Sequence, residues 1–464
     1  MCTRKRVTLA IIALAVTAPI AVDAGVRPKV VRLRRMVVVG DSILAGFVSG
    51  GLVKRDQKRA APKLLARRAG VRLSQPLMSN DGVPPPLRIE DRNGNGRLDA
   101  AEVRRGTTDV GFRRGPGRRV RTLAVPGEDM TSIFERIDAE DVLSDLASGD
   151  ADGRDILKFL ILDLPLRDDS VSQLTRARDL RPSFLMVWLG NNEVLSMATR
   201  TRPDVVSMTP AEFGAAYRQF LGQLADTGAD MAVANLPDVT RIAALRGPGG
   251  DVAECRGAAG VLEPVGPDAL LSIALDESKL PVPSCMHVLD SAEHAFVRET
   301  VVAFNDEIAA AIDEVEQNRG VAIARVDMFA LFDDVATAGY DVHGDGSLVL
   351  TTDYLGGVFS LDGIHPSRTG HALIANAFIE AINARFGESI PPLDVARIAG
   401  GDPLVGSPFR PEGEVPFGVV ANVDVEVEDA LDAAFDRLEA SADDILDDIR
   451  DRFDDLADFL DDLF

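Results

Sequence analysis

The chain has 464 residues, enough for one large domain with extensions or for two domains, and its apolar content of 46% is ordinary for a globular protein. The net charge of −23 is unevenly distributed: residues 27–121 carry 23 Lys and Arg against 8 Asp and Glu, whereas residues 428–464 carry 15 acids against 3 arginines. The overall charge therefore says little about the main domain, and the basic region lacks the interleaved aromatic residues of a nucleic-acid-binding surface.

The N-terminus has the pattern of a secretory signal. Arg4-Lys5-Arg6 precedes the apolar stretch Val7–Val22, and Val22-Asp23-Ala24 fits cleavage after a small residue. Residues 1–24 are therefore predicted to be a signal peptide, and the protein is expected to be secreted, periplasmic or at the cell surface. The alternative is an uncleaved anchor, although the apolar run is short for a membrane span.

Short apolar runs alternate with helical patterns along the chain. Strands that alternate with helices predict an α/β fold, with a parallel sheet covered by helices on both faces and with its chemistry at the carboxyl ends of the strands. The helical patterns include Pro210–Thr227 and Ala295–Asn318. The predicted strands are Met36–Val39, Thr122–Val125, Phe184–Leu189, Met231–Asn235 and Val321–Val326.

Two insertions interrupt this pattern within a main domain that is predicted to span residues 25–390. Residues 75–119 are rich in Pro, Gly and Arg, and residues 237–294 form a cap-like insertion that contains Cys255 and Cys285. In an oxidising compartment these cysteines can form a disulfide, which is worth on the order of 3–4 kcal/mol in the chain-entropy model. The alternative is two unpaired thiols. A zinc site is poorly supported, because neither cysteine lies in a short metal-ligand spacing.

The first insertion contains a sequence that fits a twelve-residue calcium loop. Oxygen ligands fall at positions 1, 3, 5, 9 and 12, with glycine at position 6 and an apolar residue at position 8. Pro84-Pro85-Pro86 excludes an ordinary entering helix, so the segment resembles the single loops of dockerins, and the expected Ca²⁺ is structural. The alternative is an Asx and glycine turn without metal. The expected ligands are Asp91, Asn93, Asn95, Arg97, Asp99 and Glu102.

Residues 341–347 match only part of this calcium-loop pattern. Thr352 stands where an acid is required at position 12, so the segment is predicted to be a hairpin turn near the active site.

Residues with catalytic potential follow three of the predicted strands. Ser42, in Gly40-Asp41-Ser42, follows the first strand, where a helix N-terminus can present its hydroxyl beside backbone N–H groups. Gly127 follows the second strand, and the missing Cβ lets a backbone N–H approach a substrate closely. Asn192 follows the third strand and can donate its side-chain N–H to an oxyanion. The structural alternatives are an N-cap for Ser42, a turn for Gly127, and a turn or cap for Asn192.

Asp362 and His365 form the pair with the most specific catalytic signal in the sequence. They lie three residues apart on a segment that precedes a helical pattern, and the chain has only 5 histidines. The carboxylate can accept a hydrogen bond from one imidazole nitrogen, which leaves the other nitrogen free to take a proton from a serine. The Asp-x-x-His spacing alone also arises by chance.

Taken together, these positions resemble the SGNH hydrolases, also called the GDSL esterase/lipase family. The resemblance covers residues 35–385 and rests on Gly40-Asp41-Ser42, Gly127, Gly190-Asn191-Asn192 and Asp362-Gly363-Ile364-His365-Pro366. It implies a three-layer flavodoxin-like fold. It also implies a nucleophile Ser42, a base His365 oriented by Asp362, and an oxyanion hole formed by Ser42, Gly127 and Asn192. The sequence departs from the family at Glu193, where Asp is usual, and at Ile43, where Leu is usual.

The resemblance implies a serine esterase or lipase that hydrolyses carboxylic esters through an acyl-enzyme. No cofactor is expected for catalysis, and the expected partner is an ester substrate, a lipid or an acylated small molecule, with no nucleic acid. One alternative is a carbohydrate deacetylase of the same fold. The other is a non-catalytic surface-binding protein on a hydrolase scaffold, and the complete set of five site residues argues against it.

The C-terminal region is predicted to be a linker at residues 391–422, followed by an acidic amphipathic helix at residues 423–464. Apolar residues recur there at spacings of three and four, while the opposite face is almost wholly Asp and Glu. Anionic membranes would repel such a helix. It is expected to pack on its own domain, to self-associate or to bind a partner.

Overall fold

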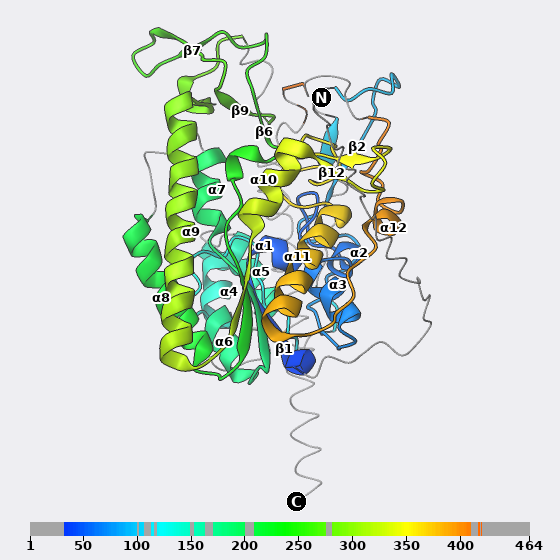
Figure 1. The fold of residues 1–464 in the computed structure, drawn as a ribbon. Helices are drawn as coiled ribbons and strands as arrows, with labels where there is room; N and C mark the ends of the chain where they lie inside the picture. The colour runs from blue at the N-terminus through cyan, green and yellow to red at the C-terminus, as the bar shows by residue number, and fades with distance from the viewer. Residues whose placement is uncertain are drawn as a thin grey trace, which may run out of the picture.

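The computed structural model describes residues 32–99, 102–105, 113–115, 118–148, 153–162, 170–199, 208–274, 281–409, 416–417 and 419. Its centre is a parallel four-stranded sheet with the strand order β1-β4-β5-β11 (Figure 1). Four of the five predicted strands form this sheet, each within two residues of its expected bounds at either end. The strands are β1 (Met36–Gly40), β4 (Phe184–Trp188), β5 (Asp230–Ala234) and β11 (Ile323–Val326).

The fifth predicted strand, Thr122–Val125, lies beside β1 without forming a regular strand. Thr122 forms an isolated parallel bridge with Val38, and the Leu123 amide donates to the Val38 carbonyl at 2.9 Å. The Val125 amide continues the pairing by donating to the Gly40 carbonyl at 3.0 Å. With this segment on the outer edge, the chain order across the sheet is 2-1-3-4-5, as in flavodoxin-like folds. The predicted three-layer α/β fold is confirmed.

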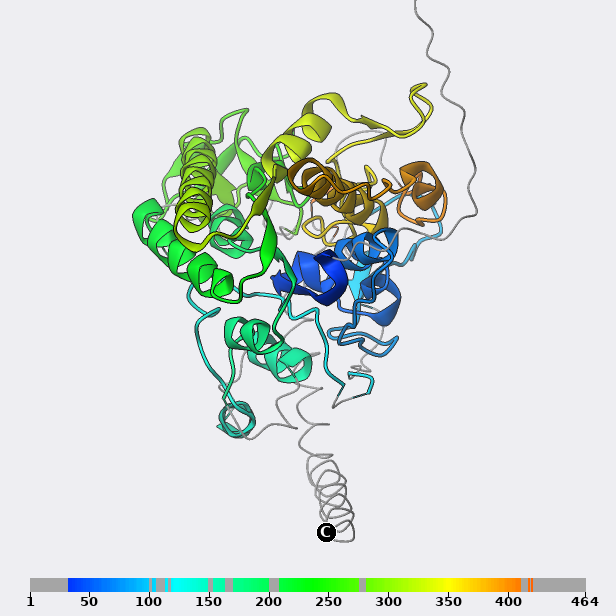
Figure 2. The same cartoon turned by 60° about the horizontal axis from the view of Figure 1, so that its bottom comes forward.

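Helices cover both faces of the sheet (Figures 1 and 2). On one side α11 (Arg368–Phe386) packs on β11 and β5 and contacts α3 (Ala61–Arg68). On the other side α6 (Gln173–Asp179) contacts β1 and α8 (Pro210–Ala225), and α8 packs along α9 (Ser291–Arg319). The interiors of β1, β4 and β5 are fully buried, which explains why these strands are nearly continuous apolar runs, whereas the edge strand β11 exposes Arg325.

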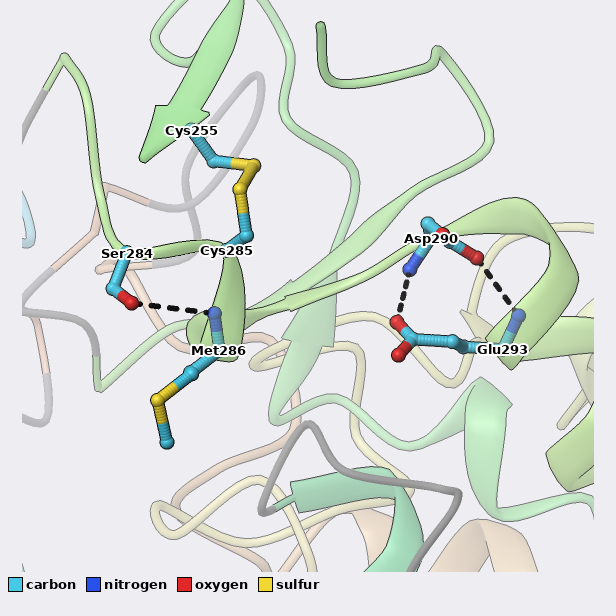
Figure 3. Close-up of a disulfide and its surroundings, with 6 residues drawn as sticks. All are labelled: Cys255, Ser284, Cys285, Met286, Asp290 and Glu293. Atoms are coloured by element: carbon cyan, nitrogen blue, oxygen red, sulfur yellow. Dashed lines mark hydrogen bonds between the residues drawn. A yellow bond between two sulfur atoms is a disulfide. The ribbon is translucent and has the colours of Figure 1, made fainter. Parts of the chain in front are cut away.

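The two long predicted helices have clear end signals. Thr209 forms a capping box with Glu212 in front of α8, and Pro210 occupies its first turn. Helix α9 begins four residues before the expected Ala295, because Asp290 and Glu293 form a capping box there (Figure 3). The remaining helices are η1 (Arg32–Arg35), α1 (Ser42–Ala45), α2 (Lys54–Gln57), α4 (Ala139–Ser148), α5 (Gly153–Leu162), α7 (Asn191–Thr199), η3 (Val239–Arg241), η5 (Cys285–His287), α10 (Met328–Ala338) and α12 (Val395–Ala399).

Both insertions contain small antiparallel sheets. In the first, β2 (Leu87–Ile89) pairs with β3 (Val103–Arg105), so a hairpin rather than helices flanks the calcium-like sequence. Similarly, β12 (Tyr340–Asp341) pairs with β13 (Val349–Leu350), which confirms the predicted hairpin turn at residues 341–347. The cap-like insertion, at the top of Figure 1, contains β6 (Leu245–Arg246), β7 (Glu254–Arg256), β8 (Leu262–Pro264), β9 (Leu270–Ser272) and β10 (Val288–Leu289).

A disulfide joins Cys255 and Cys285, with their Cα atoms 4.9 Å apart (Figure 3). The predicted pairing is therefore confirmed, and the alternative of two free thiols is wrong. Cys255 is buried in a second small core with Leu271 and Val288, so the bridge ties the β7 hairpin to the segment that leads into α9.

The segment predicted as a linker differs from a free linker. It contains α12, in which Val395 and Ala399 are buried, and the Leu393 amide donates to Asn376 on α11 at 2.7 Å. Phe417 is buried in the core of the cap beneath the guanidinium of Arg246. Proline is compatible with a loop that packs closely on a domain, because the backbone of such a loop can bond to side chains instead of to a strand or helix.

Two sequence predictions fall outside the described residues: the signal peptide at 1–24 and the acidic helix at 423–464. Within the described part of the chain, no helix combines the length and the apolar character that crossing a membrane requires.

Candidate active site

The turn after β1 exposes Ser42 at the carboxyl end of the sheet. The Asp41 carboxylate accepts hydrogen bonds from the Ile43 amide at 3.0 Å and from Asn191 Nδ2 at 2.7 Å, so Asp41 is the N-cap of α1. Ser42 is the first residue of that helix, and the interpretation of Ser42 as the N-cap is wrong. A Cβ at Gly40 would overlap the Trp188 carbonyl oxygen, which explains the glycine before this turn.

The structure brings Ser42 together with the distant pair Asp362 and His365. His365 Nε2 lies 2.8 Å from Ser42 Oγ, and His365 Nδ1 lies 3.0 Å from Asp362 Oδ2. Because an ionised carboxylate only accepts hydrogen bonds, we assign the imidazole proton to Nδ1. Nε2 is then the acceptor of the serine proton. All three side chains are mostly buried, with exposed fractions of 14% for His365 and 8% for Asp362.

Backbone amides hold the Asp362 carboxylate in place. Oδ1 accepts from the amides of Ile364 and His365 at 2.9 and 2.8 Å, and Oδ2 accepts from the Gly50 amide at 2.5 Å. Burial by itself would raise the pKa of Asp362, but the neighbouring His365 and these hydrogen bonds hold it below its usual value. Asp362 therefore stays ionised and accepts from the imidazole.

Ser49 and Ser360 join the loop after α1 to the loop that carries Asp362. The Ser49 amide donates to Ser360 Oγ at 2.7 Å, and the Leu361 amide donates back to Ser49 Oγ at 3.3 Å. Ser360 Oγ in turn donates to Asp362 Oδ1 at 3.3 Å. The sequence did not predict this supporting role for either serine, because a single hydroxyl carries no signal of what it will contact.

Gly127 and Asn192 line the same cavity. Gly127 has φ of +82°, a left-handed backbone conformation that favours glycine. Asn192 Nδ2 donates to the Glu128 carbonyl at 2.7 Å, which fixes the amide and leaves its second N–H for another acceptor. The two residues line a cavity of about 410 Å³ together with Asp129, Thr131, Glu193, Leu195, Ser196, Thr199 and Met208.

The sequence matches the GDSL-like Lipase/Acylhydrolase family over residues 36–378. The chain belongs to this family. The match spans the four blocks that contain Ser42, Gly127, Asn192 and His365, and it makes the chain a hydrolase of the esterase and lipase class. The resemblance in the sequence motifs is therefore confirmed.

Two solved structures are similar to this chain at 13% identity. One is LAE5, an alpha/beta hydrolase enzyme from the metagenome of Lake Arreo, Spain, with 75% of this chain and 93% of that chain covered at a TM-score of 0.32. The other is the extracellular lipase from Streptomyces rimosus, with 75% and 98% covered at a TM-score of 0.28. Comparison with curated proteins gave no match. Similarities at these TM-scores carry no information on the substrate.

The residue after Asn192 departs from the family pattern but keeps a defined place in the site. Glu193 Oε1 accepts a hydrogen bond from the Met130 amide at 2.6 Å, so the start of α7 is joined to the loop that carries Gly127. Burial raises the pKa of Glu193 to about 7, with smaller contributions in the same direction from Asp129 and Asp41. The longer side chain thus reaches the Gly127 loop from inside the protein.

The calcium-like loop is exposed and is folded around its own side chains. Asp91 accepts from the amides of Asn95 and Gly96, and Glu102, which is buried, accepts from the amides of Arg92 and Asp99. Asn93 and Asn95 donate to Asp99, and the Arg97 amide donates to Asn95 Oδ1. The donor set is therefore rich in oxygen, as Ca²⁺ requires. Within the described residues, however, no group of three His, Cys, Asp or Glu side chains is gathered closely enough to hold a metal ion.

Proposed function

We propose that the chain is a secreted serine esterase or lipase that hydrolyses carboxylic esters through an acyl-enzyme. The observation that carries this proposal is the relay from Ser42 Oγ to His365 Nε2, at 2.8 Å, and from His365 Nδ1 to Asp362, at 3.0 Å. A serine hydroxyl within hydrogen-bond distance of a base that is itself oriented by a third group is the signature of nucleophilic catalysis.

In the first half-reaction, His365 Nε2 takes the Ser42 proton as Oγ forms a bond to the ester carbonyl carbon. The carbonyl π electrons move to the oxygen and give a tetrahedral oxyanion. When the C–O bond to the alcohol breaks, the imidazolium returns the proton to the departing alkoxide, and an acyl-Ser42 remains. Asp362, held ionised by amide donors, stabilises the transient imidazolium.

In the second half-reaction a water molecule attacks the acyl-Ser42 carbonyl while His365 takes one of its protons. Collapse of the second oxyanion releases the carboxylic acid, and the proton passes from His365 back to Ser42 Oγ. In both steps the oxyanion accepts hydrogen bonds from the amides of Ser42 and Gly127 and from Asn192 Nδ2. Donors that are already in place when the charge develops supply much of the rate enhancement in such sites.

Substitution Ser42→Ala tests this proposal. We expect the variant to keep the thermal stability of the wild type and to lose hydrolysis of p-nitrophenyl acetate and butyrate. The wild-type protein should react with a fluorophosphonate probe, whereas Ser42→Ala should not. Retention of near-normal turnover by the variant would overturn the assignment of the nucleophile. A wild-type protein that neither turns over esters nor reacts with the probe would instead be a binding protein on a hydrolase scaffold.

The cavity beside Asn192 favours a second candidate function, the removal of short acyl groups from carbohydrates. Its side chains are mostly polar: Asp129, Thr131, Ser196 and Thr199 line it, with Leu195 and Met208 as the apolar members. A long hydrocarbon chain gains little in such surroundings, whereas hydroxyl groups find hydrogen-bond partners there. A substrate panel separates the two functions. Acetylated glycans preferred over p-nitrophenyl palmitate indicate a deacetylase, and the reverse order indicates a lipase.

Export is supported by the basic and apolar segment at residues 4–22 and by the disulfide between Cys255 and Cys285. N-terminal sequencing of protein recovered from the medium or periplasm tests it. A mature N-terminus near residue 25 is expected for a cleaved signal, whereas an intact Met1 in the membrane fraction indicates an anchor.

We also propose that the loop 91–102 binds a structural Ca²⁺, on the strength of its donor set and spacing. Glycine at position 6, here Gly96, has φ of +70°, as the sharp turn of such loops requires. Isothermal titration with CaCl₂ on the wild type and on Asp91→Asn is the test. No heat of binding at millimolar Ca²⁺ for the wild type would dispose of the site.

A further inference from the structure

A buried ion pair lies directly behind the loop that carries Gly127. Lys158 on α5 and Glu128 are both fully buried, and Lys158 Nζ lies 3.0 Å from Glu128 Oε1. Nζ also donates to the Ser132 carbonyl at 3.0 Å, and Ser132 Oγ donates to Glu128 Oε1 at 2.5 Å. Removing two charges from water is expensive, so such a pair is weak grounds for stability alone and calls for another role.

Gln173, the first residue of α6, joins this pair to the end of β1. Its Oε1 accepts from the Gly40 amide at 2.6 Å, and its Nε2 donates to the Gly40 carbonyl at 3.0 Å. The same Nε2 donates to Glu128 Oε2 at 3.0 Å, so the fully buried side chain of Gln173 bonds to both segments. Gly40 lies two residues before Ser42. The Gln173 amide therefore fixes the strand end from which the nucleophile and its backbone N–H project.

Glu128 connects the other two oxyanion donors. Its own amide follows Gly127 in the chain, and its carbonyl accepts from Asn192 Nδ2 at 2.7 Å. The end of β1 thus bonds to Gln173, Asn192 bonds to Glu128, and Gly127 precedes Glu128 directly in the chain. Burial raises the pKa of Glu128, and Lys158, Ser132 and Gln173 oppose that rise, in that order. Lys158, Ser132 and Gln173 each also contact the Glu128 carboxylate directly, as described above.

We propose that Gln173, Glu128 and Lys158 are positioning residues that hold the three oxyanion donors at the positions where an oxyanion can accept from all of them. The proposal rests on the proposed function, because it concerns the oxyanion hole of that reaction. None of the three residues touches the reacting atoms; they act through Gly40, Gly127 and Asn192. A donor that is displaced by a fraction of an ångström binds the oxyanion less well while leaving the planar ester almost unaffected. Loss of the network should therefore lower kcat rather than raise KM.

The test compares Gln173→Met with a matched control elsewhere in the protein. Met keeps the length of Gln and removes all three hydrogen bonds. The control is Asn383→Leu, because Asn383 on α11 holds Ile390 in the same two-point manner, through Ile390 N–H to Oδ1 at 2.9 Å and Nδ2 to the Ile390 carbonyl at 2.8 Å. Helix α11 begins at Arg368, three residues after His365, and Asn383 lies fifteen residues further on, about 22 Å along the helix.

With p-nitrophenyl acetate, Gln173→Met is expected to lower kcat by about 10- to 100-fold and to change KM less than about twofold. Inhibition by phenylboronic acid, whose adduct with Ser42 mimics the tetrahedral oxyanion, should weaken by a similar factor. Asn383→Leu should lower the melting temperature comparably and leave kcat and boronate inhibition near wild type. Equal effects of the two variants on kcat would overturn the proposal and assign Gln173 a purely structural role.

A second variant covers the outcome in which Gln173→Met does not fold. The double substitution Glu128→Met and Lys158→Met removes both buried charges and the bond from Gln173 Nε2 to residue 128, and it leaves no unpaired ion behind. It is expected to fold and to show the same selective loss of kcat, and wild-type kcat in this folded variant would overturn the proposal. The Ser42→Ala variant keeps the two hypotheses apart. If Ser42→Ala is active, the proposed function fails; if it is inactive and Gln173→Met behaves like its control, only the network proposal fails.

Discussion

The two sides of the candidate active site are held in place in different ways. On the triad side, Asp362 is fixed mainly by backbone amides of its own loop, those of Ile364 and His365, with Gly50 as the one distant amide donor. On the proposed oxyanion side, Asn192 Nδ2 donates to the Glu128 carbonyl, and the buried Glu128 side chain bonds to Gln173 and Lys158 on other elements.

The difference shows which part of a site can be encoded locally. A carboxylate three residues before a histidine can bond to it within one loop, so residues within the short motif set most of the geometry of this hydrogen bond. An oxyanion hole made from three separate segments has no such local solution, and its precision depends on tertiary contacts. We therefore expect substitutions on the triad side to lower activity by removing a reacting group. Substitutions on the oxyanion side should lower activity by displacing the hydrogen-bond donors.

The largest effect is expected for Asp362→Asn on the triad side. The amide N–H₂ would face His365 Nδ1 and favour the opposite imidazole tautomer, in which Nε2 carries the proton and cannot accept one from Ser42. We expect kcat for p-nitrophenyl acetate to fall by about 10⁴-fold with little change in KM. A loss smaller than about tenfold would contradict the role given to the carboxylate.

On the oxyanion side, Asn192→Leu should have the next largest effect. It removes one of three oxyanion donors and the bond to the Glu128 carbonyl, while Ser42 and His365 remain in contact. A fall in kcat of about 10²- to 10³-fold is expected, with KM nearly constant. Steady-state kinetics on the purified variant provide the measurement. If kcat is unchanged, the oxyanion hole does not include Asn192.

Ser360→Ala probes the support of the triad rather than its members. The substitution leaves the Ser49 amide without its acceptor and removes one donor to Asp362, while the amides of Ile364, His365 and Gly50 stay. We expect a stability loss of about 1–3 kcal/mol for the unpaired buried amide and a loss in kcat of less than about tenfold. Chemical denaturation and kinetics test this together. A loss of kcat as large as that of Asp362→Asn would show that the triad loop is not self-supporting.

The smallest effect on activity is expected for Glu193→Gln, which instead changes how stability depends on pH. The pKa of Glu193 is raised from 4.5 to about 7 in the fold, so the folded chain keeps a proton that the unfolded chain releases. The stabilisation from neutral Glu193 is complete below pH 4.5 and is lost as pH rises towards 7, by on the order of 3 kcal/mol. Gln has no such proton to lose.

The variant and the wild type should therefore have similar melting temperatures at pH 5, and Glu193→Gln should melt higher at pH 8. Thermal denaturation across this range measures the difference. A constant offset between the two proteins at all pH values would mean that Glu193 does not titrate in this interval.

Much of the fold follows from local patterns. The runs Met36–Val39 and Phe184–Leu189 became strands because a continuous apolar run suits a strand that is buried on both faces. The run Thr122–Val125 pairs only partly with β1, and nothing in its composition distinguishes it from the others. The predicted linker at 391–422 contains a described part that packs on the domain, which the sequence did not indicate because this packing depends on partners on α11 such as Asn376.

The candidate site divides in the same way. Ser42, Gly127, Asn192, Asp362 and His365 were all identified from short motifs, since each motif places a specific chemical group at the end of a strand or on one loop. Gln173, Lys158, Ser49 and Ser360 were not identified, because an isolated polar residue in a helix or loop carries no signal of what it will contact.

The sequence by itself determined the candidate reacting groups, the order of the strands along the chain and the cysteine pair available for a disulfide. Only the tertiary structure decided that Ser42 lies 2.8 Å from His365 across more than 300 residues, and that the buried Gln173 amide bonds to the Glu128–Lys158 ion pair. The physical reason is that side-chain chemistry and strand periodicity are local properties of the chain. Distances between strand ends and the burial of charge arise only when the sheet and its helices pack together.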